Sequence, residues 1–239
     1  MRLTVLGNAD RYLAPQAEGS AYLVEAAGRR VLLDCGHGTL ARVPEPETLD
    51  AVVISHFHYD HVIDLAPLMK CLRAGTTLVV PPGGREALDR YARAFEFRGA
   101  FDAPGPVFEA AAGAELALEA GSLLLKFAAT EHGVPSFATR VEGDRRSLVY
   151  ASDTARCAAL GRLARDADVL LAHTLLPSVE SGSDHARRHL TARSAADLAR
   201  DARSGALLLS HRFHEVPRAA YLEAAPSALL AETGRTYEI

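Results

Sequence analysis

Residues 55–61, with the sequence SHFHYDH, constrain the possible folds of this chain more than any other stretch. They follow the short apolar run 51–54, which is typical of a buried strand, and precede residues 62–69, whose apolar positions have helical spacing. Three imidazoles and a carboxylate therefore gather in one turn. Imidazole and carboxylate groups suit zinc and neighbouring divalent metals. The stretch predicts a metal site, against the alternative of a chance histidine cluster on a solvated loop.

The spacing within this stretch favours two metal ions over one. His56 and His58 lie two positions apart on an extended segment, so their side chains can face the same way. Asp60 and His61 are adjacent at the start of the helix, where they would point to a second position. We therefore expect one ion near the first pair and another near the second pair.

Three more candidate ligands each follow a strand-like apolar run: His132 after 123–129, Asp153 after 147–151 and His211 after 206–210. Alone, His132 would be an ordinary polar loop residue, and Asp153 could be the N-cap of a helix over 154–165. Beside the first motif we expect all three to bind metal. The two oxygens of Asp153 could bridge the two ions and set their spacing.

A further histidine, His189, precedes Thr191, the expected N-cap of a helix that ends at Gly205. Because anions collect at helix N-termini, His189 is a candidate for binding a phosphate. The alternative is a surface histidine beside the helix. We interpret His214 as a surface residue, since His211 already occupies the strand end.

The remaining apolar runs and turn signals predict an alternation of strands and helices. Strands are expected over residues 3–6, 20–26, 30–34, 51–54, 77–80, 107–110, 115–118, 123–129, 137–142, 147–151, 169–172 and 206–210. Helices are expected after the histidine stretch to about residue 73, over 85–95, over 154–165 and from Thr191 to Gly205.

Composition bounds the class of protein. A chain of 239 residues that is 49% hydrophobic can bury the core of one domain over residues 1–239. Its formal net charge of −4 argues against general affinity for nucleic acid. The three cysteines form no CxxC pair, which fits a reduced, cytoplasmic protein. The sequence enters a strand directly, so we expect no signal peptide and no membrane span.

The HxHxDH stretch resembles the signature of the metallo-β-lactamase superfamily, and the order of the later candidates resembles its RNase Z-like branch. The segments 32–36 (LLDCG), 150–154 (YASDT) and 189–192 (HLTA) also resemble that branch. The resemblance implies an α/β fold, a four-layer αββα sandwich with a di-zinc site where the two sheets meet. Manganese or iron could replace zinc. A homodimer is also implied.

The expected metal ligands are His56, His58, Asp60, His61, His132, Asp153 and His211. We expect His56, His58 and His132 at one ion and Asp60, His61 and His211 at the other, with Asp153 between them. The resemblance also implies that Asp34 supports a metal-binding histidine from outside the coordination sphere, by accepting its far N–H. The alternative for Asp34 is a turn residue before Gly36.

Two departures from the branch bear on the substrate. Only twenty residues separate His132 from Asp153, enough for one hairpin, where tRNA-processing members carry a long tRNA-binding arm. His173-Thr174 stands where that family has a His-Glu-Ala-Thr stretch, so the glutamate is missing. Together with the acidic net charge, these departures make structured tRNA a doubtful partner.

The expected function is hydrolysis of a small phosphodiester, such as a cyclic nucleotide, by two zinc ions about 3.5–4 Å apart. The ions would lower the pKa of a shared water to about 7. Asp60 would orient the attacking oxygen, and His189 would donate a hydrogen bond to the phosphate or protonate the leaving oxygen. The alternatives are RNA 3′-end cleavage, hydrolysis of an ester, lactone or thioester, and a metal-binding module without turnover.

Overall fold

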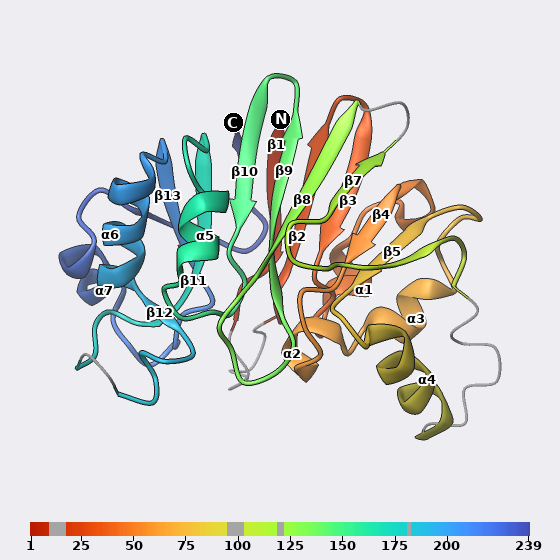
Figure 1. The fold of residues 1–239 in the computed structure, drawn as a ribbon, viewed down its shortest axis with the longest axis horizontal. Coiled ribbons are helices and arrows are strands. Elements are labelled where there is room, and N and C mark those ends of the chain that lie inside the picture. Colours follow the sequence, from red (N-terminus) through yellow and green to blue (C-terminus); the bar gives the residue numbers. More distant parts are fainter. Residues whose placement is uncertain (10–17, 95–102, 119–121, 181–182) are drawn as a thin grey trace.

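The computed structural model describes residues 1–9, 18–94, 103–118, 122–180 and 183–239. Two mixed β-sheets pack face to face, with helices on both outer faces (Figure 1). In these residues the first sheet contains, in order, β15 (Thr236–Glu238), β1 (Arg2–Gly7), β2 (Ala21–Ala26), β3 (Arg29–Leu33), β4 (Ala51–Val53), β5 (Thr77–Val80) and β6 (Val107–Glu109). The second contains β14 (Leu229–Leu230), β13 (Ala206–Ser210), β11 (Val169–Leu176), β10 (Arg146–Tyr150), β9 (Phe137–Gly143), β8 (Leu123–Ala129) and β7 (Glu115–Leu118), and β12 (Leu190–Thr191) pairs with β11.

The helices form the two outer layers. The first sheet carries α1 (Thr39–Arg42), a 3₁₀ turn (Pro46–Thr48), α2 (Tyr59–Val62), α3 (Leu65–Met69) and α4 (Gly84–Ala94). The second sheet carries α5 (Ala158–Leu163), α6 (Ala192–Ala202) and α7 (Arg218–Ala224). No helix in the described part of the chain is long and apolar enough to cross a membrane.

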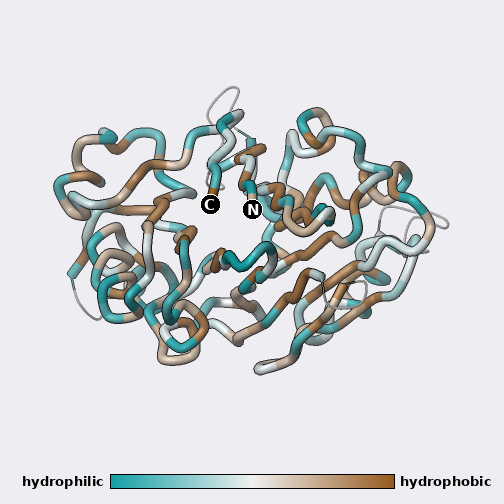
Figure 2. The backbone as a smooth tube through the Cα atoms, turned by 90° about the horizontal axis from the view of Figure 1, so that it is seen from above, coloured by the Kyte–Doolittle hydropathy of each residue, from teal (hydrophilic) through white to brown (hydrophobic). Residues whose placement is uncertain are grey.

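Alternation along the strands builds three apolar layers. In β10, Leu148 and Tyr150 face the core between the sheets, whereas Val149 packs under α5 and α6. In β4, Val53 faces the same central core and Val52 packs against the α3 side. Figure 2 shows the hydrophobic segments along the strands and the two chain ends side by side, which the pairing of β1 with β15 joins. The predicted αββα sandwich is confirmed.

The strand directions bring the candidate site residues to one edge. The strands β3, β4 and β5 are parallel to one another, as are β10, β11 and β13. The segments that follow β3, β4, β10 and β13 meet at this edge, and α2 and the loop after β8 lie along it at the bottom of Figure 1. The carboxyl ends of parallel strands are the usual position of a site in such sheets.

Most of the expected strands are confirmed, but the expected helix to residue 73 is wrong. The chain forms two short helices, α2 and α3, that are separated at Asp64. Pro67 explains the break, because its ring would clash with the carbonyl of residue 63 in a continuous helix. The Asp64 carboxylate also accepts the backbone N–H of Leu40 at 3.1 Å and so fixes the junction.

Other elements differ at their ends. The helix expected over 154–165 begins only at Ala158, because Cys157 has an extended backbone (φ −129°, ψ 158°) and is the N-cap, and the N–H of Ala155 donates instead to the carbonyl of Glu131 at 2.8 Å. The strand expected over 169–172 continues to Leu176, where it pairs with β12. Helix α6 ends at Ala202 rather than at Gly205. The expected end of α4 at residue 95 lies outside the described residues.

Close backbone packing holds the histidine loop, residues 55–61, against the first sheet. The N–H of Ser20 donates to the carbonyl of Asp60 at 2.9 Å, and the N–H of Cys35 donates to the carbonyl of His61 at 2.8 Å. A Cβ added to Gly36 would lie 2.1 Å from the carbonyl oxygen of Asp60. Glycine at position 36 therefore permits the approach that places the loop.

We predict that Gly36→Ala lowers the free energy of unfolding by about 1–3 kcal/mol, because the added methyl group overpacks a backbone contact. Urea denaturation of the metal-free protein measures this change. The control is Gly161→Ala in α5, whose added Cβ would meet Leu198 at 3.7 Å, an ordinary contact. Alanine is the better helix former, so the control should gain up to about 1 kcal/mol. Equal stability of the two variants would contradict the prediction.

Candidate metal centre

The first group of candidate ligands comes from the histidine loop and the loop after β8. The Nδ1 of His58 lies 3.0 Å from the Nε2 of His56 and 3.2 Å from the Nε2 of His132. The Oδ2 of Asp153 lies 4.0 Å from the Nε2 of His56 and 3.9 Å from that of His132. Ligands of one tetrahedral zinc ion are about 3.3 Å apart at bond lengths of about 2.0 Å. This first cluster, His56, His58, His132 and Asp153, has the spacing of a metal site.

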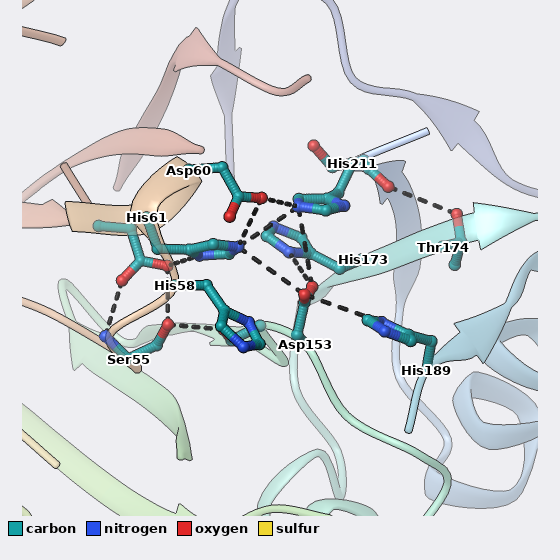
Figure 3. A network of polar contacts seen from close by, with 12 residues as sticks. Ser55, His58, Asp60, His61, Asp153, His173, Thr174, His189 and His211 are labelled. Atoms are coloured by element: carbon teal, nitrogen blue, oxygen red, sulfur yellow. Dashed lines mark hydrogen bonds and ion pairs between the residues drawn. The ribbon is translucent and has the colours of Figure 1, made fainter. Parts of the chain in front are cut away.

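A second cluster lies on the other side of Asp153 (Figure 3). The Nε2 of His211 lies 3.1 Å from the Oδ2 of Asp60 and 3.3 Å from the Nε2 of His61. The Oδ2 of Asp60 is 3.6 Å from the Nε2 of His61. Asp153 approaches both histidines, with Oδ2 3.8 Å from His61 and Oδ1 3.9 Å from His211. We call Asp60, His61, Asp153 and His211 the second cluster.

In two histidines, the hydrogen bond made by Nδ1, which points away from the cluster, decides which tautomer Nε2 presents to the cluster. The Nδ1–H of His61 donates to the Oδ2 of Asp34 at 2.7 Å, and the Nδ1–H of His132 donates to the carbonyl of Arg188 at 3.0 Å. In the neutral form that binds metal, an imidazole carries one N–H, so with Nδ1 protonated the Nε2 of each ring faces the cluster as the metal-binding atom. Such outer partners orient metal-binding histidines and fix their tautomer.

The hydroxyl of Ser55 fixes the tautomer of His56 in the same way. It donates its only proton to the Oδ2 of Asp34 at 2.8 Å and receives the hydroxyl proton of Ser152 at 2.7 Å. The contact of 3.0 Å with the Nδ1 of His56 must then be donated by the histidine. The Nε2 of His56 therefore also presents a lone pair. A neutral histidine with its free nitrogen turned inward is the form that binds a divalent metal, so these residues fit such an ion.

The electrostatics of the site favour cations as well. Burial opposes ionisation of Asp60, yet the hydrogen bond from His211 and the charge of His61 lower its pKa to about 2. Burial likewise opposes charge on His61, yet the neighbouring Asp34 and Asp153 raise its pKa to about 9. The pKa of Asp153 is held well below its usual value against burial, chiefly by His211 and His173. Ionised carboxylates thus create a negative potential that stabilises bound cations.

Backbone conformation around the site is strained in three places. Asp34, Ser152 and His211 all have left-handed backbone conformations, with φ values of 60°, 55° and 53°. Non-glycine residues in this region cost of order 1 kcal/mol or more, and they cluster at functional sites. Each of the three lies directly after, or two residues after, a strand that ends at the site edge. The strain turns the chain sharply enough to aim the next side chains at the clusters.

Residues 29–212 match the family model of the β-lactamase superfamily domain. The chain belongs to this superfamily. It is 28% identical over 223 residues to the probable metallo-hydrolase YhfI of Bacillus subtilis, covering 90% of this chain and 88% of YhfI. It is 30% identical over 240 residues to ribonuclease Z of Mycobacterium sp. (strain KMS), covering 88% of this chain and 84% of that protein. The predicted placement in the RNase Z-like branch is confirmed.

Solved structures agree on the fold. The crystal structure of YhfI superposes with a TM-score of 0.82 at 23% identity, covering 99% of each chain. The crystal structure of the short form of human tRNase Z superposes with a TM-score of 0.80 at 21% identity, covering 100% of this chain and 99% of the human one. Membership of the β-lactamase superfamily and the two His/Asp clusters together support divalent metal binding by this chain.

The structure brings the seven residues expected as ligands together, and it places two others nearby. The Nδ1 of His189 lies 3.7 Å from the Oδ2 of Asp153. Asp34 is both a turn residue and a support for a candidate ligand. Its backbone is left-handed, and its carboxylate accepts the N–H of His61. Asp153 is not a helix N-cap, because α5 has Cys157 at that position. His214 is 47% exposed, as expected for a surface residue.

Sequence reasoning missed His173. This residue lies within β11, is buried, and places its Nδ1 3.0 Å from the Oδ1 of Asp153. It could also belong to a group of potential ligands with His61, Asp153 and His211. The signal was present in the sequence, since His173 follows the apolar run 169–172 just as His211 follows 206–210. Because the sequence predicts that the strand ends at residue 172, it places His173 in a loop, where the direction of its side chain cannot be predicted.

We predict that Asp153→Ala loses both equivalents of metal, because its carboxylate lies within reach of both clusters. Elemental analysis after gel filtration measures the metal content per chain. His214→Ala is the matched control, since His214 is exposed and pairs with Glu215. The control should keep the metal of the parent protein. Full metal content in folded Asp153→Ala would show that Asp153 does not bridge the ions.

Proposed function

We propose that this protein is a metal-dependent hydrolase that holds two zinc ions and cleaves a small phosphodiester, with a cyclic nucleotide as the leading example. The observation that carries the proposal is the sharing of Asp153 between the clusters. Its Oδ2 approaches His56 and His132, and its Oδ1 approaches His211. In this proposal His56, His58 and His132 bind one ion, and Asp60, His61 and His211 bind the other. Manganese or iron would suit the same donors.

Two adjacent bound metals would supply charge neutralisation at the phosphate oxygens and a water of lowered pKa. The protein supplies orientation. Asp60 is ionised, with a pKa of about 2, so at neutral pH its carboxylate can accept a hydrogen bond from the attacking water. The Nε2 of His211, 3.1 Å from Oδ2 of Asp60, holds that carboxylate in place.

His189 acts in this proposal as a hydrogen-bond donor to the phosphate. Burial lowers its pKa to about 3, the attraction of Asp153 being too weak to compensate, so the ring is neutral at physiological pH. A neutral ring donates one hydrogen bond, and proton transfer to the leaving oxygen requires that the bound anion raise this pKa. Its ring packs edge-on against His132 with centroids 5.0 Å apart, which supports a position over the first cluster.

The N-terminus of α6 offers fewer free N–H groups to a bound phosphate than the sequence predicts. Thr191 is the N-cap of α6, as predicted, and its hydroxyl accepts the N–H of Ser194 at 3.1 Å. The N–H of Arg193 donates to the carbonyl of Pro177 at 3.1 Å. These first-turn groups are thus engaged within the protein. A second source of positive charge is Arg188, whose guanidinium lies beside Gly133, next to His132.

A cavity lies beside the histidine loop, and none of the described residues that line it is a candidate metal ligand. It has a volume of about 260 Å³ and is lined mainly by apolar side chains of the histidine loop, α2, α3 and α4. Phe57 and Tyr59, which alternate with the candidate ligands, contribute to its wall. Since alternate side chains of an extended segment face opposite ways, we do not include this cavity in the proposed substrate site.

Cleavage of RNA 3′ ends is the second candidate, because ribonuclease Z is among the relatives. The segment between His132 and Asp153 forms the single hairpin of β9 and β10, without a long arm. With a net charge of −4, few phosphates would be neutralised by the surface. Small substrates therefore remain our first choice, and the homodimer stays a prediction.

We predict weak binding to precursor tRNA at physiological salt, with a shallow dependence of affinity on salt, because few cationic side chains would contact phosphate. Filter binding or fluorescence anisotropy over a salt series measures both quantities. Tight binding together with accurate cleavage at the 3′ end would overturn the assignment to small phosphodiesters.

A second prediction separates phosphate from carbonyl chemistry. His189→Ala should keep its metal but lose about 10²–10⁴ in kcat on bis(p-nitrophenyl) phosphate and on cyclic nucleotides, because a positioned donor has been removed. Steady-state kinetics with parallel metal analysis measure this loss. A lactone or thioester, which offers no phosphate oxygen, should be hydrolysed by the variant at nearly the parent rate. His214→Ala controls for the loss of a histidine, and unchanged phosphodiester turnover in metal-loaded His189→Ala would falsify the role of His189.

A further inference from the structure

A buried chain of polar groups crosses from the first sheet to Asp153. Tyr22, on β2, places its hydroxyl 2.6 Å from the Oγ of Ser210 and 3.0 Å from the Nε2 of His173. The other ring nitrogen of His173 lies 3.0 Å from the Oδ1 of Asp153. All four side chains are at most 3% exposed. The first sheet therefore contacts the shared carboxylate through two hydrogen bonds in series, from Tyr22 to His173 and from His173 to Asp153, and Ser210 forms a side branch at Tyr22.

The protons in this chain have one consistent arrangement. An ionised Asp153 only accepts hydrogen bonds, so the Nδ1 of His173 carries the proton. A neutral imidazole with its proton on Nδ1 presents a lone pair on Nε2, which lies 3.0 Å from the hydroxyl of Tyr22. The hydroxyl of Tyr22, which burial keeps protonated by raising its pKa, then donates to that lone pair. The hydroxyl of Ser210 donates to the oxygen of Tyr22.

His173 has an alternative role as a direct ligand in place of Asp60. Its ring stacks on that of His211, with centroids 4.5 Å apart. Three observations favour contact with the carboxylate instead. The Nδ1 of His173 is within hydrogen-bond distance of the Oδ1 of Asp153, whereas the Nε2 of His211 lies 3.9 Å from the same oxygen. Asp60 already offers an oxygen 3.1 Å from His211. The opposite nitrogen of His173 is held by Tyr22.

We propose that His173 and Tyr22 are positioning residues that fix the rotation of the Asp153 carboxylate between the two metal ions. The hydrogen bond from His173 holds Oδ1 on the side of the second cluster and leaves Oδ2 facing His56 and His132. Tyr22 fixes the tautomer and the ring of His173. The inference rests on the proposed two-metal site, and it adds residues that act on the metal only through Asp153.

The test uses cobalt(II) binding to the metal-free protein, followed by visible absorption and equilibrium dialysis. Loss of a hydrogen bond behind a metal ligand typically weakens metal affinity 10–100-fold. Tyr22→Phe and His173→Ala should weaken binding of the second cobalt equivalent by that factor. His173→Asn can return an N–H to the position of Nδ1, and it should restore affinity to within a few-fold of the parent. His173→Gln places its amide nearer Nε2 and should not.

Tyr221→Phe is the matched control, because it removes a buried tyrosine hydroxyl that donates to the carbonyl of Leu175 at 2.5 Å, a contact that includes no candidate ligand. It should bind both equivalents like the parent. Parent-like affinity in Tyr22→Phe would overturn the role of Tyr22. If His173→Asn and His173→Ala lost affinity equally, with the same loss of ligand-field intensity, His173 would be a ligand. Cobalt binding needs no substrate, so these results are independent of whether phosphodiester turnover is found.

Discussion

The carboxylate of Asp34 is the interaction on which the rest of the site depends. It is fully buried and accepts four hydrogen bonds, from the N–H and hydroxyl of Ser55, from the Nδ1–H of His61 and from the hydroxyl of Tyr150. These donors belong to the end of β4, to α2 and to the second sheet. Loss of the carboxylate would leave several buried donors without an acceptor, which costs more than the hydrogen bonds themselves contribute. One side chain therefore fixes the histidine loop and the distance between the sheets.

Two tyrosines connect the sheets in opposite directions. Tyr150 extends from the second sheet to Asp34, and Tyr22 extends from the first sheet to Ser210 and His173. Their rings lie 5.3 Å apart within the central apolar core. Because each cluster takes ligands from both sheets, a shift of one sheet against the other would separate the ligands. Packing of the core thus contributes directly to the geometry of the metal site.

The parts of the site that lie at the ends of strands could be predicted from the sequence, because an apolar run followed by a histidine or aspartate fixes both the element and the edge. Asp153 and His211 are of this kind. His173 also follows such a run, but β11 continues past it to pair Thr174 with Leu190, so the end of the apolar run does not mark the end of this strand. Tyr22 reads as an ordinary strand residue, and its partner Ser210 lies 188 positions away. Contacts of this kind depend on how the sheets stack, which local periodicity does not encode.

The two clusters differ in the protons that they hold before metal binds. Burial lowers the pKa of His56 and His58 below the usual value, so these two residues of the first cluster offer neutral nitrogens at physiological pH. In the second cluster the pKa values of His61 and His211 are raised against burial, mainly by the neighbouring carboxylates. A metal entering the second cluster must therefore displace protons. The carboxylates that attract a cation also attract protons, so in the proposed two-metal site the second cluster would lose its ion first as the pH falls. In that proposal the carboxylate of Asp153 would connect the two binding equilibria, because an ion in the first cluster would offset the negative charge that retains those protons.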